Sequence, residues 1–463
     1  MTDALAMTVR TRSGFATILT CVLAALAGLM FGLDIGVISG ATRFIQAEFE
    51  VSNRAIEWIV SSMMLGAAVS AAAAGWLSAT LGRKRSLILS ALLFVGGSML
   101  CGVAWSPWVL AGARFVLGLA IGTATFTAPL YLAEVAPGRI RGAMISTYQL
   151  MITIGIFVAF LSDTALSYSG AWRWMLGVVA LPGGLFLLGV LGLPESPRWL
   201  LLRGRRDEAV AVLDRLRDDP AEARREADDI AQQLKSPRHG WRLFLCNANF
   251  RRSVGLGVLL QVMQQLTGIN VIMYYAPRIF AGMGFGDGAQ MWATAIVGLV
   301  NMLATFAAIG LVDRWGRRPI LYLGFAVMAA SLGAVGALMQ AGTPTHAMQV
   351  AVVAALLVFI AGFAMSAGPM VWTLCSEVQP LRGRDFGIAC STCANWIVNM
   401  AVGASFLSLL DGIGATWTFW LYAAFNLVFV AFTHVWVPET SGVTLEHIER
   451  HLMAGWPLRR LGR

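Results

Sequence analysis

Long runs of apolar residues, separated by short polar segments, cover most of this chain. A membrane whose apolar core is about 30 Å thick requires roughly 20 apolar residues for each helix that crosses it. Twelve runs approach or exceed this length, at residues 15–40, 58–80, 86–105, 108–134, 144–165, 174–193, 253–280, 290–312, 319–340, 348–374, 386–410 and 415–437. The pattern therefore predicts an all-α membrane protein with twelve transmembrane helices.

The longest polar segment, residues 194–252, separates the sixth run from the seventh. Within it, Asp219 precedes Pro220 and Glu222, the order of an N-cap, a first-turn proline and an acidic N3 residue. Its mixed charges favour short helices lying under the membrane over a partly ordered linker. We therefore expect a first six-helix bundle over residues 1–193, linker helices over 194–252, a second bundle over 253–437 and a tail over 438–463.

Composition agrees with a membrane protein. The chain is 57% hydrophobic and 13% charged, with a net charge of +9, whereas soluble domains carry about 25% charged residues. Arg43, Arg54, Arg173 and Arg278 fall on one side of the predicted helices, Arg114 lies inside one, and the remaining basic residues fall on the other side. Because basic loops stay in the cytoplasm, both termini are predicted to be cytoplasmic.

The placement of the positive charge also argues against nucleic acid as a partner, and the lipid bilayer is the expected surroundings. Cys390 and Cys393 have the spacing of a metal or redox motif, but the chain has no second ligand pair. Two small residues that ease helix contact explain them better. We expect no metal and no cofactor.

Three short charged motifs occur twice, each in the same place within a six-helix unit. EVAPGRIR at 134–141 returns as EVQPLRGR at 377–384, GRK at 82–84 as GRR at 316–318, and PES at 194–196 as PET at 438–440. The chain is therefore predicted to be a tandem repeat of six plus six helices. Such repeats are typical of transporters whose halves rock about a central site.

The repeated charges predict a breakable contact between the halves on the cytoplasmic side. Carboxylates and guanidinium groups at helix ends form bidentate pairs, and pairs exposed to water are weak enough to open in every cycle. The expected cytoplasmic latch contains Glu134, Arg141, Arg83, Arg317, Glu377 and Arg384. Inward-oriented positive charge alone would explain the arginines but not the two matched glutamates.

Two charges lie deep in the apolar runs, where charge is costly and usually functional. Asp34 lies about six residues before the outer end of the first run, and Arg114 about six residues after the outer start of the fourth. Both are therefore at the same depth, where a carboxylate stays ionised beside an arginine and binds a proton when that partner is lost. The pair is predicted to carry the coupling proton, the alternative being a static structural ion pair.

Uncharged polar side chains recur at mid-depth. Amides offer a donor and an acceptor together, which suits a sugar hydroxyl group, and an indole face suits the C–H face of a pyranose. The candidate sugar-binding residues are Gln149, Gln264, Gln265, Asn270, Asn301, Trp372 and Asn395. Gly268 is expected to break the seventh helix, as happens at transport sites. For any single amide, a hydrogen bond between helices is an equally good explanation.

At these residues the chain resembles the sugar porter family of the major facilitator superfamily, over essentially its whole length. The motifs that carry the resemblance are GRK at 82–84, PESPRWL at 194–200, QQLTGIN at 264–270, DRWGRRP at 313–319 and PET at 438–440. FGLDIGVISG at 31–40, YQLMITIGI at 148–156 and NVIMYYAP at 270–277 are most similar to bacterial galactose–proton and arabinose–proton symporters.

The resemblance implies the major facilitator fold and a central sugar site. It adds Phe31, Gly368 and Trp396 to the sugar-binding residues, and it implies that Tyr274 and Tyr275 close the outer side. It also implies a monomer. The chain departs from the family at one position of the motif that begins at Gly75. The family usually has an aspartate four residues later, where this chain has Ala79. The second half keeps the corresponding aspartate, Asp313.

The predicted function is proton-coupled uptake of a monosaccharide, either a galactose- or glucose-type hexose or arabinose. An uncoupled facilitator is the alternative within transport, and Asp34 argues against it, because passive carriers of this family lack that acid. A sugar sensor would normally carry a longer cytoplasmic output tail than residues 438–463. An enzyme is not expected, since the chain has no His-Glu-x-x-His, no catalytic carboxylate pair in a polar domain and no nucleotide motif.

Overall fold

A computed structural model describes residues 2–137, 140–217, 219–234, 240–342, 345–380 and 383–462, except for the side chains of residues 2–15, 233 and 311–314. Within these ranges every regular element is a helix. Twelve helical segments are long and apolar enough to cross a membrane. The sequence prediction of an all-α protein with twelve membrane-crossing segments is therefore confirmed.

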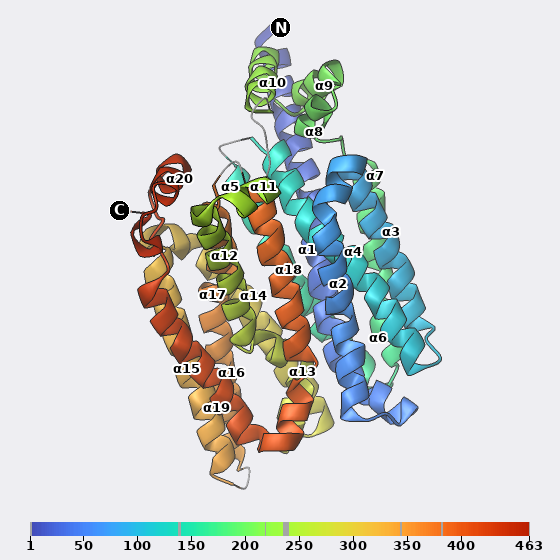
Figure 1. Ribbon diagram of the computed structural model, residues 1–463. Helices are drawn as coiled ribbons and strands as arrows, with labels where there is room; N and C mark the ends of the chain where they lie inside the picture. Colours follow the sequence, from blue (N-terminus) through green and yellow to red (C-terminus); the bar gives the residue numbers. More distant parts are fainter. Residues whose placement is uncertain are drawn as a thin grey trace.

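The first half contains six membrane-crossing segments, which lie together on the right of Figure 1. Its helices are α1 (Thr2–Phe49), α2 (Asn53–Leu81), α3 (Arg83–Gly102), α4 (Pro107–Val135), α5 (Arg141–Ser167), α6 (Trp172–Gly177) and α7 (Ala180–Leu191). The last two helices together make one crossing. Serine caps fix two of the helix starts: the hydroxyl groups of Ser52 and Ser106 each accept a backbone N–H at 3.3 Å.

Four short helices follow: α8 (Pro197–Leu202), α9 (Arg206–Leu216), α10 (Pro220–Leu234) and α11 (Gly240–Cys246). The first three pack on one another at the same end of the molecule as both chain termini (Figure 1). As predicted, α10 begins at Pro220, and the Asp219 carboxylate accepts the Ala221 N–H at 2.8 Å. The described part of the predicted linker thus contains short helices, and its last residues already belong to α12, which begins at Ala248.

The second half repeats the arrangement on the left of Figure 1. Its helices are α12 (Ala248–Leu266), α13 (Ile269–Gly282), α14 (Asp287–Trp315), α15 (Arg317–Gln340), α16 (His346–Met365), α17 (Ala367–Glu377), α18 (Arg384–Gly403) and α19 (Phe406–Val435), followed by α20 (Leu445–Met453) and the short 3-10 helix η1 (Leu458–Arg460). Two crossings are each made of two helices, α12 with α13 and α16 with α17.

The predicted boundary between the last two crossings was wrong. The sequence pattern placed residues 404–410 in the eleventh crossing, but α18 ends at Gly403 and α19 begins at Phe406. The backbone of α19 is then kinked at Gly414. The segment is mostly apolar, with Ser405 and Ser408 as its polar residues, so hydropathy does not reveal a turn at the membrane surface.

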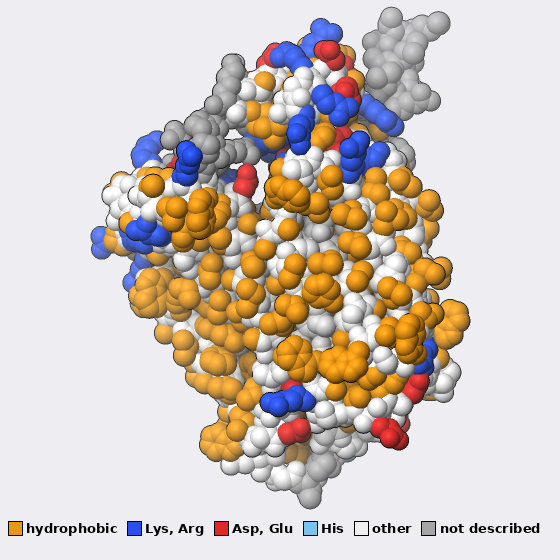
Figure 2. Space-filling model, turned by 45° about the vertical axis from the view of Figure 1, so that its right-hand side comes forward, with side chains coloured by type: hydrophobic (Ala, Val, Ile, Leu, Met, Phe, Trp, Pro, Cys, Tyr) orange, Lys and Arg blue, Asp and Glu red, His pale blue; other side chains and the backbone are white. Residues whose placement is uncertain are grey.

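Apolar side chains form a wide band across the face of the molecule shown in Figure 2, while basic side chains gather at the end that carries α8–α11. Large residues such as Trp76, Leu181 and Leu188 are more than two-thirds exposed within this chain. Such a surface suits hydrocarbon, where the helices satisfy their own backbone hydrogen bonds. The chain is therefore a multi-pass membrane protein, and we call its two ends the basic end and the far end.

The two halves touch along α1 and α13, α2 and α18, and α5 and α14. Several polar contacts join them at the far end, including Arg43–Asp287 at 2.8 Å and Asn53–Asp411 at 2.8 Å. At the basic end, a notch separates the two lobes of the surface (Figure 2). The far end is therefore the closed end in this structure.

Candidate functional site

Five amide side chains from α12, α13 and α18 form one hydrogen-bonded cluster inside the second half. Asn395 donates to Gln264 at 2.9 Å and to Gln261 at 2.5 Å, and it accepts from Gln265 at 3.0 Å. Asn270 donates to Gln265. The structure thus brings together four of the predicted sugar-binding residues. The cluster also contains Gln261, which the sequence analysis missed although it lies one helical turn before Gln264 and Gln265.

Two broken helices border this amide cluster. Gly268 has φ = 92°, a left-handed conformation that separates α12 from α13 and is easily adopted only by glycine. The predicted break in the seventh crossing is therefore confirmed. A second break, which was not predicted, separates α16 from α17 at Ser366. Beyond it, the carbonyl groups of Ala367 and Gly368 accept hydrogen bonds from Gln264 at 2.9 and 3.1 Å.

Aromatic side chains meet across the two halves beside the amide cluster. The rings of Phe31 on α1 and Trp396 on α18 lie 5.3 Å apart, and Trp396 follows Asn395 directly. Trp372 on α17 is 39% exposed. Gln149 on α5 is half-buried and Asn301 on α14 is buried. Among the described contacts, neither joins the amide cluster by a direct hydrogen bond, so the structure does not bring these two predicted residues into the cluster.

Asp34 and Arg114 lie together in the interior of the first half. The Arg114 Nη2 atom is 3.5 Å from the Asp34 Oδ2 atom, and both side chains are almost fully buried. Arg114 also donates through Nε to the Ile59 carbonyl group at 3.1 Å, while its Nη1 atom has no described partner. The pair is therefore long and incompletely satisfied. A contact of this kind is more easily broken than a bidentate ion pair.

The sequence pattern placed one acid, Asp34, deep in a predicted crossing, but the structure buries further acids as well. Glu57 on α2 and Asp163 on α5 are each only 1% exposed. The predicted crossings began at residue 58 and ended at residue 165, which left Glu57 outside and placed Asp163 close to an end. Both helices extend further in the structure. Asp163 accepts the Gly40 N–H at 3.0 Å, and its second oxygen atom has no described partner.

The two tyrosines expected at the outer gate are fully buried on α13. The Tyr275 hydroxyl group donates to the Gly403 carbonyl group at 2.9 Å, and its ring stacks on Phe406 with the centroids 5.3 Å apart. The Tyr274 hydroxyl group lies 3.3 Å from the Asn399 amide nitrogen. These contacts pack α13 against the turn between α18 and α19, all within the second half.

The charged motifs at the basic end form two equivalent clusters. Arg83 makes a bidentate pair with Glu134, with both bonds at 2.8 Å, and Arg317 pairs with Glu377 at 3.3 Å. Each pair lies within one half. The expectation that these residues join the halves is therefore not met in this conformation, in which the lobes are separated at the basic end. The first pair is also buried rather than exposed.

The remaining residues of the expected latch are less connected. Arg141 is exposed, and Arg384 makes a long contact of 3.4 Å to the Gln379 carbonyl group. Arg139 and Arg382, the central arginines of the two repeated motifs, lie outside the described residues, as does the side chain of Asp313.

The glutamates of the PES and PET motifs have a structural role that the sequence analysis missed. Glu195 accepts the backbone N–H groups of Arg83 and Lys84 at 2.9 and 3.1 Å, at the start of α3. Glu439 does the same for Arg317 and Arg318 at the start of α15, at 3.0 Å each. A carboxylate at a helix N-terminus satisfies unpaired donors and the helix dipole.

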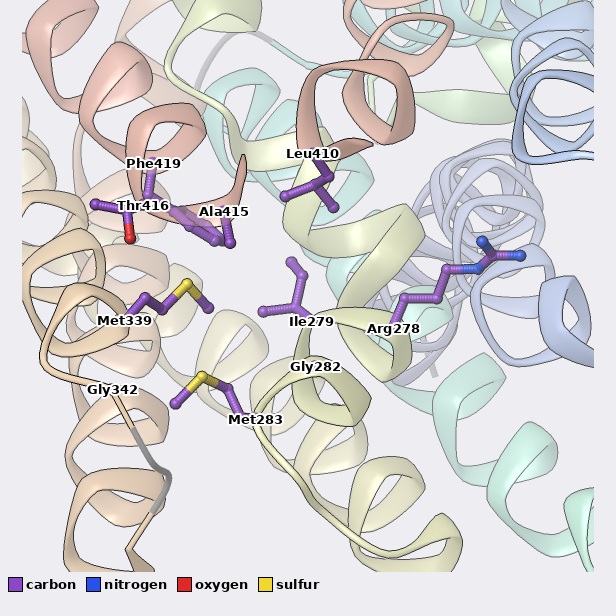
Figure 3. Close-up of a pocket in the computed structure, with 10 residues that line it drawn as sticks. All are labelled: Arg278, Ile279, Gly282, Met283, Met339, Gly342, Leu410, Ala415, Thr416 and Phe419. Carbon is purple, nitrogen blue, oxygen red and sulfur yellow. The ribbon is translucent and has the colours of Figure 1, made fainter. Parts of the chain in front are cut away.

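A cavity of about 320 Å³ opens at the far end of the second half, between α13, α15 and α19 (Figure 3). It is lined mainly by apolar residues, including Ile279, Met283 and Met339, and the guanidinium group of Arg278 points away from it. It contains none of the predicted sugar-binding residues. The amide cluster therefore remains the candidate site, since, unlike this cavity, it offers several donors and acceptors suited to hydroxyl groups.

Twelve crossings in two repeated halves, with a buried polar site beside two broken helices, define a transporter of the major facilitator superfamily. The family model described as "Sugar (and other) transporter" matches residues 20–452, and the chain belongs to this family.

Relatives with known names agree with this assignment. The chain is 60% identical to a galactose-proton symporter of Escherichia coli (strain K12), over 96% of each chain. It is 56% identical to an arabinose-proton symporter of the same organism, over 95% of this chain and 94% of the relative.

Solved structures are similar over almost the full length. The inward-open conformation of the xylose transporter XylE from Escherichia coli is 28% identical, with a TM-score of 0.81, over 95% of this chain and 100% of the other. The proton:xylose symporter XylE bound to 6-bromo-6-deoxy-D-glucose is 29% identical, with a TM-score of 0.80, over 95% and 99% of the two chains.

Proposed function

We propose that this protein couples the uptake of a monosaccharide to proton entry by alternating access. One observation carries the proposal: a buried cluster of amides at two broken helices lies in the same molecule as a buried, loosely held Asp34–Arg114 pair. The first arrangement is suited to sugar hydroxyl groups, and the second to reversible protonation. The similarity to named galactose-proton and arabinose-proton symporters supports the same function.

The sugar would bind between the halves. Gln264, Gln265, Asn270 and Asn395 would exchange some of their mutual hydrogen bonds for bonds to hydroxyl groups, so that binding leaves no buried amide unpaired. Phe31, Trp372 and Trp396 would supply ring faces, and the backbone at Gly368 a close approach. Gln149 and Asn301 would complete the site from α5 and α14. Tyr274 and Tyr275 would close it on the outer side.

Asp34 would bind the coupling proton. When Arg114 is close, the carboxylate is stabilised in its ionised form. A rearrangement that lengthens the pair beyond 3.5 Å would leave a buried charge without compensation, which is costly unless the carboxyl group takes up a proton. Sugar binding and proton binding would in this way favour the same conformations.

The basic end would face the cytoplasm, together with both termini, because positively charged loops are retained there. We assign residues 1–193 to the first bundle, 194–252 to the linker helices, 253–437 to the second bundle and 438–463 to the tail. The protein would act as a monomer in a bacterial inner membrane, with a monosaccharide and a proton as its partners and no nucleic acid.

The test uses the purified protein in lipid vesicles that contain a pH-sensitive dye. Adding D-galactose, D-glucose or L-arabinose outside should acidify the interior, and an imposed inward proton gradient should concentrate the labelled sugar. Sugar entry without either effect would indicate an uncoupled facilitator. Competition among the three sugars against one labelled hexose would identify the preferred substrate.

A further inference from the structure

Glu57 makes an unusual contact between the two halves at the far end. Its carboxylate, only 1% exposed, projects from α2 in the first half. It accepts the backbone N–H of Ser408 and the hydroxyl hydrogen of the same residue, both at 2.7 Å. Ser408 lies in the first turn of α19 in the second half. The carboxylate therefore binds the N-terminal end of a helix that belongs to the other half.

This contact is electrostatically favourable and geometrically demanding. The first N–H groups of a helix lack partners within the helix and carry partial positive charge. A carboxylate that is taken out of water is costly unless hydrogen bonds compensate it. Here one oxygen atom receives the N–H and the other receives the hydroxyl group. The compensation exists only while the two halves touch, so separating them at this end leaves both partners to be hydrated again.

A second set of polar residues lies near the first. Arg278 on α13 donates to Asn53 at 2.9 Å and also to Gln46. The amide of Asn53 donates to Asp411 on α19 at 2.8 Å. These bonds again run between the first and the second half. Asn53 lies one helical turn before Glu57 on α2, and Asp411 lies one turn after Ser408 on α19. We call these contacts between the halves, together with the contact of Glu57 with Ser408, the far-end lock.

We infer that the far-end lock holds the outer side closed, and that the Glu57 carboxylate on the start of α19 is its principal contact. This inference rests on the proposed alternating-access function. It adds a polar lock between the halves to the two tyrosines, whose described bonds stay within the second half. Opening toward the outside would require Glu57 to leave Ser408 while Arg278 releases Gln46 and Asn53.

The test measures the opening of the far end without measuring transport. Spin labels are placed at Ser169 and Ala289, which are exposed residues near this end of the first and second half. Cys246, Cys390 and Cys393 are replaced by serine so that they do not react. Electron–electron resonance in lipid nanodiscs then gives the populations of short and long distances between the labels.

We expect Glu57→Gln to raise the ratio of long to short distances by about tenfold, because an amide has one acceptor oxygen and no charge. Ser408→Ala should shift the ratio in the same direction but less, since the backbone N–H remains. In the double variant the two effects should not add, because both act on one contact.

Glu48→Gln is the matched control. Glu48 is also a carboxylate near the far end, but its partners Trp172 and Arg173, at 2.6 and 2.7 Å, lie in its own half. It should leave the distances unchanged. The inference is overturned if Glu57→Gln behaves like Glu48→Gln, or if Ser408→Ala, which leaves the carboxylate intact, produces no shift. A vesicle assay without proton coupling would overturn the proposed function while leaving this result unaffected.

Discussion

At the residue scale, the coupling role proposed for the Asp34–Arg114 pair can be tested by a single substitution. Asp34→Asn keeps the shape of the side chain but removes the charge that a proton can neutralise. We expect this variant to bind sugar and to exchange labelled for unlabelled sugar, while failing to concentrate sugar under an inward proton gradient. The measurement is accumulation in vesicles, compared with exchange at equal pH on both sides.

Asp163→Asn provides the matched comparison, because Asp163 is equally buried but accepts only a backbone N–H in the described contacts. It should retain accumulation. If it abolishes accumulation while the Asp34 variant concentrates sugar as the parent does, the coupling carboxyl group is on α5 and our assignment is incorrect.

The amide cluster is the site that we propose for the sugar, and its contribution to affinity can be measured. Gln264→Ala removes three described hydrogen bonds, two to carbonyl groups and one to Asn395. We expect the free energy of sugar binding to become less favourable by about 1–3 kcal/mol, which is roughly a 5- to 150-fold loss of affinity. Quenching of tryptophan fluorescence by sugar reports it, since Trp396 adjoins the cluster.

The control for this substitution is Gln290→Ala. Gln290 is also buried, and its amide donates to the Phe285 carbonyl group at 2.7 Å, but it lies at the far end of α14. Equal loss of affinity in both variants would indicate a general effect on folding and would remove α12 from the site.

At the element scale, the packing of α1 against α5 places the first half of the site. A β-carbon added at Gly32 would lie 1.9 Å from the carbonyl oxygen of Ile152, which is closer than two non-bonded atoms can approach. We expect Gly32→Ala to destabilise the folded protein by about 1–3 kcal/mol, because the helices must separate. Thermal unfolding in detergent measures it.

Gly96→Ala is a suitable control, because a β-carbon there meets nothing within 4 Å and alanine favours a helix interior by about 1 kcal/mol. It should be neutral or slightly stabilising. A Gly32 variant as stable as the Gly96 variant would mean that α1 and α5 can move apart without cost.

At the scale of the whole molecule, the charge clusters at the basic end bear on the conformational equilibrium. Glu377 holds Arg317 and also accepts the Thr440 hydroxyl group at 2.5 Å. If the two clusters meet when the basic end closes, Glu377→Gln weakens that closed state. We expect reagents that modify cysteine to enter between the two halves from the basic end more readily in this variant.

Glu208→Gln serves as the control, since Glu208 pairs with Arg205 within the linker helices. It should leave the accessibility unchanged. Unchanged accessibility in the Glu377 variant, accompanied by lower thermal stability, would show that these clusters only hold each half together.

The sequence by itself determined the class of this protein. Hydropathy alone gives twelve crossings, because a membrane-spanning helix must be apolar along about 20 consecutive residues whatever its neighbours are. The paired motifs, such as EVAPGRIR and EVQPLRGR, give the repeat. Gly268 permits the break in the seventh crossing, since glycine adopts the left-handed conformation found there without a steric penalty.

Only the tertiary structure decided which of these residues meet. Glu134 and Glu377 look alike in the sequence whether they bind their own half or the other, and the structure places each with an arginine of its own half. The sequence did not reveal the roles of Gln261 and Glu57, because the role of a buried amide or carboxylate depends on its hydrogen-bond partners on neighbouring helices. Those partners lie more than a hundred residues away in the chain, and no pattern of apolar and polar positions specifies them.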